Sequence, residues 1–346
     1  LCARNVRLGG SLALPTGRPP RQAFSLVELL IVIAIIGILI GILIPAVQSS
    51  RAAAARNACG NNLRQIGLAA HNHQASLGYF PNGSVAKEYP GKPLAEWTLY
   101  RWSALASLTP YLENTAAYDA LDLSVPLYDN ISFKVRPENV EAVRTVVAEF
   151  LCPSDVGRPV SEDFGPTNYA VCAGSGIRGG TPRNTDGMFF TNSETTPAKI
   201  TDGLSKTALA SESLLGQPQT DTHDPQLEYK FKLTAPLSES VCESTSNWNY
   251  TDPRGFAWVN GEYRCGLYNH WRTPNAELPD CMGVSVAGGV QARYAPYGWR
   301  AARSNHPSGV NMLLADGSLR FVGDEVDAAV WKDLATIAGG ETSAVP

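Results

Sequence analysis

The chain has 346 residues, of which 44% are hydrophobic and 17% are charged, and its formal net charge at pH 7 is −4. This composition is typical of a folded protein with a sizeable core and excludes a largely disordered chain. The sequence shows no basic patch that suits a phosphate backbone, so we expect no nucleic-acid partner.

The N-terminus carries a short basic segment followed by an apolar run. Residues 1–23 hold four arginines and no acidic residue, and residues 24–46 contain a single charge, Glu28. At about 1.5 Å per helical residue, residues 24–44 span about 31 Å, close to the hydrocarbon thickness of a membrane. Because the arginines precede this span, the N-terminus should stay in the cytoplasm and the rest should be exported. No A-x-A-like site precedes Pro45, which argues against an ordinary secretory signal.

Glu28 is unexpected in a simple membrane anchor. Insertion scales put a central Asp at about 2.5–3.5 kcal/mol, and less near the membrane interface. A chain that needed only an anchor would carry Leu or Val at this position. We therefore expect the Glu28 carboxylate to have a partner.

The next segments favour helices. Residues 47–77 are expected to continue the membrane helix, because the alanines at 52–55 favour helix and an apolar stripe recurs near every 3.6 residues. The stripe consists of Leu63, Ile66, Ala70 and Leu77. This helix should end near Gly78. A second helix is predicted over Trp102–Leu121, with Pro110 as a point of interruption.

The rest of the chain is predicted to form short strands and turns, in keeping with its 31 glycines and 24 prolines. The strand-like segments are VRTVVAEFL, NYAVCA, GMFFT and SKTALASE. Residues 215–300 show little periodicity and are interpreted as a loop-rich elaboration. Near the C-terminus, VNMLLA, DG and SLRFV predict a β-hairpin.

The junction RQAFSLVELLIVIAIIGILIGILIPA resembles the class III signal of type IV pilins and type II secretion pseudopilins. The resemblance implies that a prepilin peptidase cleaves between Ala23 and Phe24 and methylates Phe24. Ala23 stands where those families usually have Gly. Glu28 becomes the fifth mature residue, and the resemblance implies that it pairs with the N-terminal amine of a neighbouring subunit. Such a pair would offset the desolvation cost and set the subunit register.

The chain as a whole resembles the bacterial family named domain of unknown function 1559. The resemblance rests on NACGNNLRQIG, FLCPSD and a C-terminal motif of His, nine residues and Asp-Gly, here His306 with Asp316 and Gly317. It implies an α+β, pseudopilin-like fold, in which a long N-terminal helix, half of it transmembrane, packs on an antiparallel β-sheet head. The expected parts are a leader (1–23), a transmembrane part (24–46), a soluble part of the helix (47–78) and an exported head (79–340). The family implies an inner-membrane location but no activity.

Six of the seven cysteines remain once Cys2 leaves with the leader. They are Cys59, Cys152, Cys172, Cys242, Cys265 and Cys281. An even number on the exported side predicts disulfides, with free buried thiols as the alternative. The family resemblance points to Cys59–Cys152, because both cysteines lie in its motifs, and it leaves the other four unassigned. Without a C-x-x-C motif, neither a redox dithiol nor a zinc site is favoured.

His306 and Asp316 do not form an acid–base pair in this interpretation. The intervening strand would place them about 20 Å or more apart, at opposite ends. Asp316 and Gly317 are expected to form a turn that needs positive φ, and His306 is expected to be a turn residue that bonds nearby backbone. A ligand or assembly role for the motif is the alternative.

Other candidate sites are weaker. His71 and His73 lie two residues apart on a helix, so they should face different ways. GLSKT lacks the glycine spacing of a phosphate loop, and no nucleophile elbow is present. A calcium site is a minor alternative, with Asp316, Asp324, Glu325 and Asp327 as its ligands. We expect no cofactor and no metal.

Three functions remain. The first is a structural subunit that assembles with copies of itself or with other pseudopilins. The second is a tethered module that binds a solute or polysaccharide through residues 248–299, although its four tryptophans are better explained as core residues: Trp248, Trp258, Trp271 and Trp299. The third, an exported hydrolase, is least favoured, because no nucleophile constellation is evident, and we expect the protein not to be an enzyme.

Overall fold

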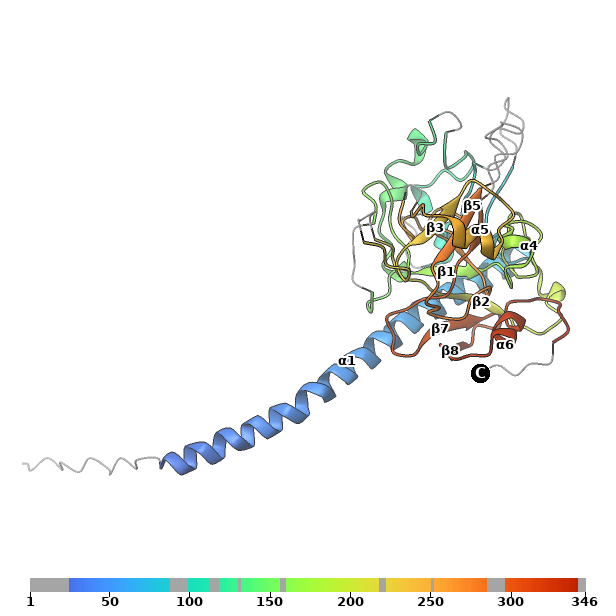
Figure 1. Cartoon of the computed structure of the whole chain (residues 1–346). Coiled ribbons are helices and arrows are strands. Elements are labelled where there is room, and N and C mark those ends of the chain that lie inside the picture. Colours follow the sequence, from blue (N-terminus) through green and yellow to red (C-terminus); the bar gives the residue numbers. More distant parts are fainter. Residues whose placement is uncertain are drawn as a thin grey trace, which may run out of the picture. The chain divides into compact units, whose positions relative to one another are not determined.

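The computed structural model describes residues 25–87, 99–112, 118–129, 132–155, 160–217, 222–249, 252–284 and 296–341. The chain forms two compact units, Leu1–Ser50 and Arg51–Pro346. Its first element is the helix α1, Leu26–Leu77, drawn in blue in Figure 1. The predicted leader and the proposed cleavage residues Ala23 and Phe24 lie outside the described residues.

The apolar side chains in the N-terminal part of α1 are exposed to solvent. None of its apolar stretch is buried, and its length and composition allow it to cross a membrane. Ser25 and Glu28 cap this end: the Val27 N–H donates to Ser25 Oγ at 3.4 Å, and the Ser25 N–H donates to Glu28 Oε2 at 2.9 Å. These two bonds cap the helix start as in a capping box, except that Ser25 Oγ accepts from the second helical residue and not from the third.

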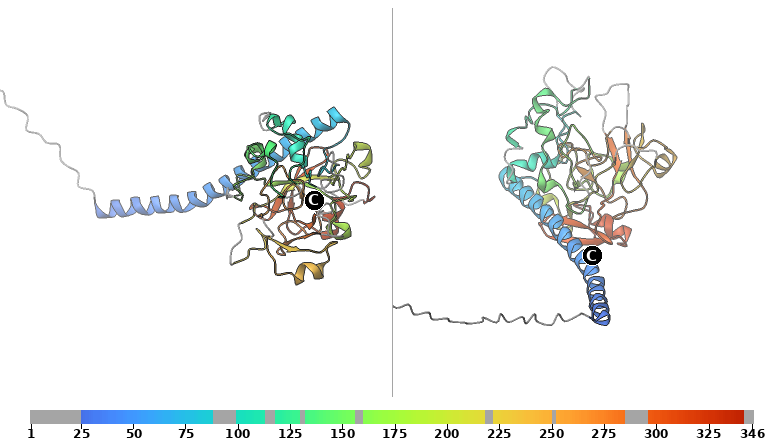
Figure 2. Two further views of the ribbon diagram at one scale, coloured as in Figure 1. Left: turned by 90° about the horizontal axis from the view of Figure 1, so that it is seen from above. Right: turned by 90° about the vertical axis from the view of Figure 1, so that its left-hand side faces the viewer.

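In the second unit, α1 packs along a five-stranded sheet, as Figures 1 and 2 show. Three residues of the predicted stripe, Leu63, Ile66 and Ala70, are buried, whereas Leu77 is 52% exposed. Gly67 allows a close approach, since a Cβ added there would lie 2.9 Å from Leu313 Cδ2. The helix ends where expected: Gly78 has φ +88° and its N–H donates to Gln74 O at 2.8 Å.

The five-stranded sheet has the order β4-β1-β2-β7-β8. Its strands are β1 Tyr169–Cys172, β2 Ala208–Glu212, β4 Leu267–Tyr268, β7 Gly309–Leu314 and β8 Leu319–Gly323. Neighbouring side chains on β7 enter different cores: Leu313 joins the cluster with Leu63 and Ile66 of α1, and Met312 joins the cluster with Trp331. The sheet therefore lies between α1 and α6, Ala328–Asp333.

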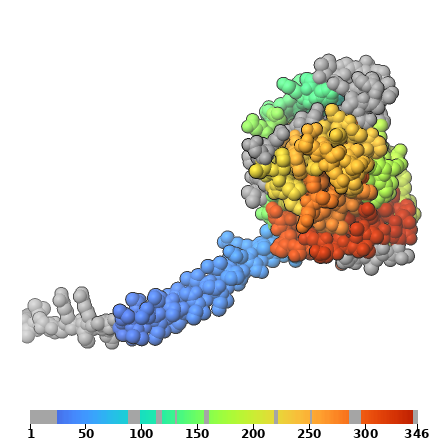
Figure 3. Space-filling model, viewed as in Figure 1, coloured from blue at the N-terminus to red at the C-terminus, as the bar shows by residue number. Residues whose placement is uncertain are grey.

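A second sheet has three strands in the order β3-β5-β6. They are β3 Tyr229–Lys232, β5 Asp280–Val284 and β6 Pro296–Trp299. In Figure 3, the C-terminal segment, in red, forms one edge of the visible face of the head, next to the segment drawn in yellow and orange. The β1–β4 and β3–β5 pairs are parallel. The α+β class is thus confirmed, but the sheets are mixed where an antiparallel sheet was expected.

Short helical segments lie between α1 and β1 and between later strands of the described chain. They are α2 Ala104–Leu108, η1 Thr109–Tyr111, η2 Pro137–Asn139, η3 Ala142–Arg144, η4 Ala148–Phe150, α4 Ile177–Gly180, η5 Pro197–Lys199 and α5 Glu239–Ser244. The predicted helix over Trp102–Leu121 is present only in part: the α-helix covers Ala104–Leu108, Pro110 lies in a 3₁₀ turn, and residues 118–119 are helical again. Residues 113–117 of that prediction lie outside the described residues.

Two predicted strands were also wrong. VRTVVAEFL contains two 3₁₀ turns, and GMFFT makes only an isolated bridge from Thr191 to Ser84. Val143, Phe150 and Phe189 nevertheless lie in the main core. Burial of these side chains therefore does not require strand pairing, and tertiary packing overrides the β-propensity of the segments.

Candidate functional site

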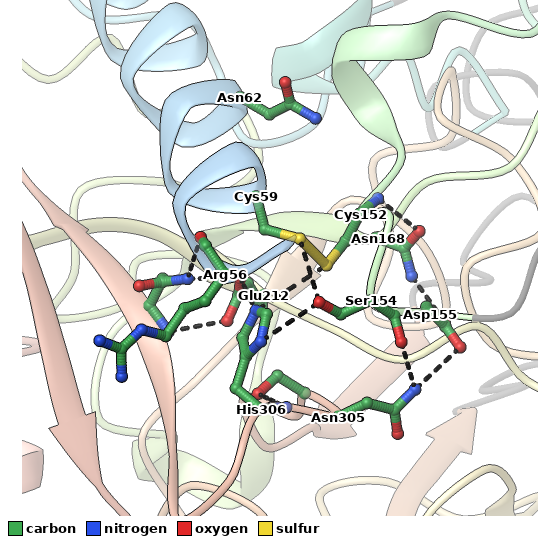
Figure 4. Close-up of a disulfide and its surroundings, with 12 residues drawn as sticks. Arg56, Cys59, Asn62, Cys152, Ser154, Asp155, Asn168, Glu212, Asn305 and His306 are labelled. Atoms are coloured by element: carbon green, nitrogen blue, oxygen red, sulfur yellow. Dashed lines mark hydrogen bonds and ion pairs between the residues drawn. A yellow bond between two sulfur atoms is a disulfide. The ribbon is translucent and has the colours of Figure 1, made fainter. Parts of the chain in front are cut away.

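Four segments far apart in the sequence meet beside the five-stranded sheet (Figure 4). α1 contributes Cys59, and the segment after η4 contributes Cys152 and Ser154. Glu212 is the last residue of β2, and His306 lies in the loop that leads into β7. Because β2 and β7 are neighbouring antiparallel strands, the end of one strand lies beside the start of the other. This pairing brings Glu212 and His306 together.

A disulfide forms one wall of this site. Cys59 and Cys152 are bonded, with Cα atoms 4.9 Å apart and a sequence separation of 93. The Asn62 side chain donates to Leu151 O at 2.7 Å, and the Cys152 N–H donates to Asn168 Oδ1 at 3.0 Å. The pairing that the family resemblance implied is therefore present, and it joins α1 to the segment after η4.

The other four cysteines do not all pair. Cys242 of α5 bonds Cys281 of β5, whereas Cys172 and Cys265 are free and buried. Cys172 and Cys265 belong to different hydrophobic clusters, which explains why these two cysteines do not form a third disulfide. Burial raises the pKa of the Cys172 thiol to about 12 and raises the pKa of Cys265 still further. Both thiols should therefore be unreactive.

His306 is a buried member of this site. Its side chain is 1% exposed; Nε2 lies 3.0 Å from Glu212 Oε1, and Nδ1 lies 3.3 Å from Ser154 Oγ. Nε2 also lies 3.9 Å from Cys152 Sγ. The expectation that His306 bonds nearby backbone was wrong for its ring. The strand order instead places the imidazole beside Glu212 and Ser154, which lie 94 and 152 positions earlier in the sequence.

Glu212 is held as firmly as His306. Its Oε1 accepts a hydrogen bond from Asn311 Nδ2 at 2.8 Å, and its Oε2 accepts one from the Asn311 N–H at 2.7 Å. The carboxylate is therefore oriented by β7 before it meets the imidazole. Glu212, Ser154 and Asn311 were not predicted from the sequence. The available signal was an acidic residue at the end of a strand that is otherwise buried, in SKTALASE.

Asp316 and Gly317 lie away from this site, at the other end of β7. The Ser318 N–H donates to Asp316 Oδ1 at 2.8 Å, and the Gly317 N–H donates to Leu314 O at 2.9 Å. Gly317 has φ +85°, which an L-residue adopts with difficulty. His306 and Asp316 thus flank one strand, and the Asp-Gly pair makes the turn from β7 to β8.

The weaker candidates do not assemble. His73 Nδ1 lies 3.0 Å from Tyr79 O, and burial lowers the pKa of His73, whereas the His71 ring packs edge-on against Phe80. Asp327 caps α6, and Asp324 accepts a hydrogen bond from Asn275 at 2.8 Å. Among the described residues, the potential metal ligands gather at one place only, and the acidic residues suggested for calcium are not among them.

The four tryptophans of residues 248–299 do not form one surface. Trp258 and Trp299 are buried, and Trp258 Nε1 donates to Thr145 O at 2.8 Å. Trp271 stacks on Trp299 with ring centroids 4.4 Å apart, and Trp248 stacks on His223 at 4.6 Å. At least two of these residues therefore serve the core, which was the structural alternative.

The site brings together two sets of functional groups. Ser154, His306 and Glu212 place a hydroxyl, an imidazole and a carboxylate in one row, an order the sequence analysis did not find. The same imidazole and carboxylate also lie beside two sulfur atoms. The ligand atoms of Cys59, Cys152, Glu212 and His306 all lie within 4.8 Å of one another.

The N-terminal candidate, Glu28, lies in the first turn of α1. Residues 18–44 match the family described as "Prokaryotic N-terminal methylation motif", which together with the apolar helix indicates a membrane anchor of the prepilin type. Residues 48–329 match the family described as "Protein of unknown function (DUF1559)". No curated protein and no solved structure matches the chain. Neither family description names a catalytic activity. The region that matches DUF1559 thus follows directly after a prepilin-type methylation motif, and the chain belongs to the DUF1559 family.

Proposed function

We propose that the protein is a membrane-anchored, exported structural subunit of the pseudopilin type, which a prepilin peptidase processes and which assembles through its N-terminal helix. The observation that carries this proposal is the methylation motif over residues 18–44. Copies of the same chain or other pseudopilins are the partners, in a type II secretion-like or type IV pilus-like system.

The proposed topology follows from charge and cysteine chemistry. Residues 1–23 form the leader, residues 24–46 cross the inner membrane, and the four leader arginines keep the N-terminus in the cytoplasm. The soluble part of the helix (47–78) and the head (79–340) are exported. Two disulfides support this assignment, since disulfides persist in oxidising compartments outside the cytoplasm.

Glu28 supplies the assembly contact in this proposal. In the single chain its Oε2 accepts the Ser25 N–H, so it caps its own helix. Cleavage after Ala23 would create a charged amine on Phe24, four residues before Glu28. In an assembly, the amine of one subunit would pair with the carboxylate of its neighbour. That pair would offset the cost of a charge in the membrane and set the register between helices.

The first test is the N-terminal mass of the protein isolated from its own membranes. We expect a chain that begins with N-methylated Phe24. An intact leader, or a cut beyond Pro45, would contradict the proposal. Ala23→Gly provides the matched control, because it restores the residue usual before the cut and should be processed at least as completely as the natural chain.

The second test separates assembly from helix capping at Glu28. Glu28→Gln keeps a side-chain oxygen that can accept the Ser25 N–H but removes the charge. We expect the Glu28→Gln protein to be processed and membrane-bound, but no longer to co-purify with a differently tagged copy of the chain. If Glu28→Gln assembles like the natural protein while Glu28→Ala does not, the residue acts as a helix cap and the assembly role is wrong.

A further inference from the structure

We propose that Cys59, Cys152, His306 and Glu212 form a redox-gated metal site. When the Cys59–Cys152 pair is oxidised, its disulfide joins α1 to the segment after η4. When it is reduced, the same four side chains bind one divalent ion of the zinc class and keep the two segments joined. This inference concerns the soluble part of α1 and the head, and it does not depend on the proposed assembly.

The ligand set and its spacing fit a tetrahedral ion. Zinc bonds sulfur at about 2.3 Å and nitrogen or oxygen at about 2.0–2.2 Å, so its ligands lie about 3.3–3.8 Å apart. His306 Nε2 lies 3.9 Å from Cys152 Sγ and 3.0 Å from Glu212 Oε1. All four ligand atoms lie within 4.8 Å of one another, and all four residues are buried. Small movements of the side chains therefore suffice to surround one ion.

Reduction of the disulfide itself moves the two sulfur atoms to the separation that two sulfur ligands of one zinc ion need. Two thiols that are no longer bonded must move apart to van der Waals contact, which for heavy atoms is about 3.5–4.0 Å. That is also the distance between two sulfur ligands of zinc. The cysteine Cα atoms are 4.9 Å apart, so the backbone already holds both side chains at one point.

The groups around the ligands are arranged as a metal site requires. Histidine ligands usually donate their second ring N–H to a fixed acceptor, which orients the ring. Here His306 Nδ1 lies 3.3 Å from Ser154 Oγ, which leaves Nε2 for the ion. Asn311 holds both oxygens of Glu212 through its N–H and its side-chain amide. The imidazole and the carboxylate are therefore oriented before any ion arrives.

A dithiol serves as the reductant of the Cys59–Cys152 disulfide. The dithiol transfers two electrons and two protons, breaks the Cys59–Cys152 bond, and is itself oxidised to a disulfide. Metal binding then releases two protons to solvent as the thiols become thiolates. Two thiolates with an imidazole favour zinc-class ions, whereas Ca²⁺ and Mg²⁺ prefer sites made only of oxygen ligands.

The second disulfide provides a matched control within the same chain. Cys242–Cys281 is also buried, but it lies in a cluster with Leu237 and Trp299. Within the described part of the chain, no group of three metal-type ligands includes either of these cysteines. Reduction should therefore generate two further buried thiols there without creating a metal site.

The test uses the full chain in detergent, oxidised or reduced with a phosphine under anaerobic conditions, with Zn²⁺ as the probe in competition with a chromophoric chelator. We expect one Zn²⁺ per reduced chain, none per oxidised chain, and a higher Tm of the reduced chain when Zn²⁺ is present. Co²⁺ should give the absorption bands of a tetrahedral thiolate site. Cys242→Ser with Cys281→Ser should bind like the natural protein, and His306→Ala should weaken binding at least about tenfold.

Several results would overturn the proposal. One is reduced protein that binds no more Zn²⁺ than the oxidised protein, and this comparison needs no substitution. Another is undiminished binding by Cys59→Ser with Cys152→Ser, which would place the ion elsewhere. A third is a reduced head that unfolds and does not regain its Tm with Zn²⁺.

Discussion

Asp280 holds together a buried charge cluster whose loss should destabilise the head strongly. Its Oδ2 accepts a hydrogen bond from Arg254 Nη1 at 2.6 Å, and its Oδ1 accepts bonds from Arg303 Nη2 and the Ala301 N–H, both at 3.1 Å. The three charged side chains are 0% exposed. Asp280→Asn would remove the carboxylate that two buried guanidinium groups share, and would point an amide N–H at one of them.

Removing one partner of a buried ion pair costs about 3–5 kcal/mol, because the remaining charge stays buried and uncompensated. We therefore expect Asp280→Asn to lower the free energy of unfolding of the head by about 4 kcal/mol. The measurement is chemical denaturation followed by tryptophan fluorescence, with the m-value compared between proteins. Asp163→Asn is the control, since Asp163 pairs with Arg144 at 2.9 Å on the surface and should matter little.

The pH dependence gives a second readout of Asp280. Burial alone would raise the pKa of its carboxyl, but Arg303 and Arg254 outweigh burial and hold that pKa below its usual value. The contribution of Asp280 to stability is therefore present above about pH 4 and is lost as pH falls through the folded pKa. An effect of Asp280→Asn no larger than that of Asp163→Asn at pH 7 would refute the reasoning.

Three further predictions concern other parts of the head. Burial lowers the pKa of His270 to about 3, whereas an unfolded His takes up a proton near pH 6.5. The unfolded state thus binds more protons between these values, and this residue should lower the free energy of unfolding by up to about 1.4 kcal/mol per pH unit below pH 6.5; denaturation at several pH values should show a slope that is shallower in His270→Gln by that amount, while His73, whose pKa burial also lowers, still contributes. Cys59→Ala with Cys152→Ala opens a loop of 93 residues and should cost about 4.6 kcal/mol in the chain-entropy relation; urea titration measures this loss, and a change below about 1 kcal/mol would contradict it. Gly317→Ala should cost about 1–2 kcal/mol, because φ is +85° at this turn. Gly323→Ala, where the nearest atom to an added Cβ is 3.7 Å away, should leave the Tm nearly unchanged in the same thermal melts; equal shifts for the two variants would show that the turn imposes no strain.

The sequence alone determined the features that depend on neighbouring residues. The apolar run, the stripe of Leu63, Ile66 and Ala70, and the end of α1 at Gly78 follow from helix periodicity and the permissive backbone of glycine. The hairpin around Gly317 follows from two strand-like segments joined by Asp-Gly. In each case the physical cause lies within a few residues of its effect, so local patterns suffice.

Only the tertiary structure decided the candidate site. Glu212 and His306 are 94 residues apart, and they meet because β2 pairs with β7. The parallel pairing of β1 with β4 and the burial of Cys172 and Cys265 in separate cores likewise depend on long-range packing. A strand carries no local mark of its partner, because ladder hydrogen bonds use the same backbone groups in every strand. The sequence thus specified the ligand-type side chains of the site, and the order of the strands decided which of them meet.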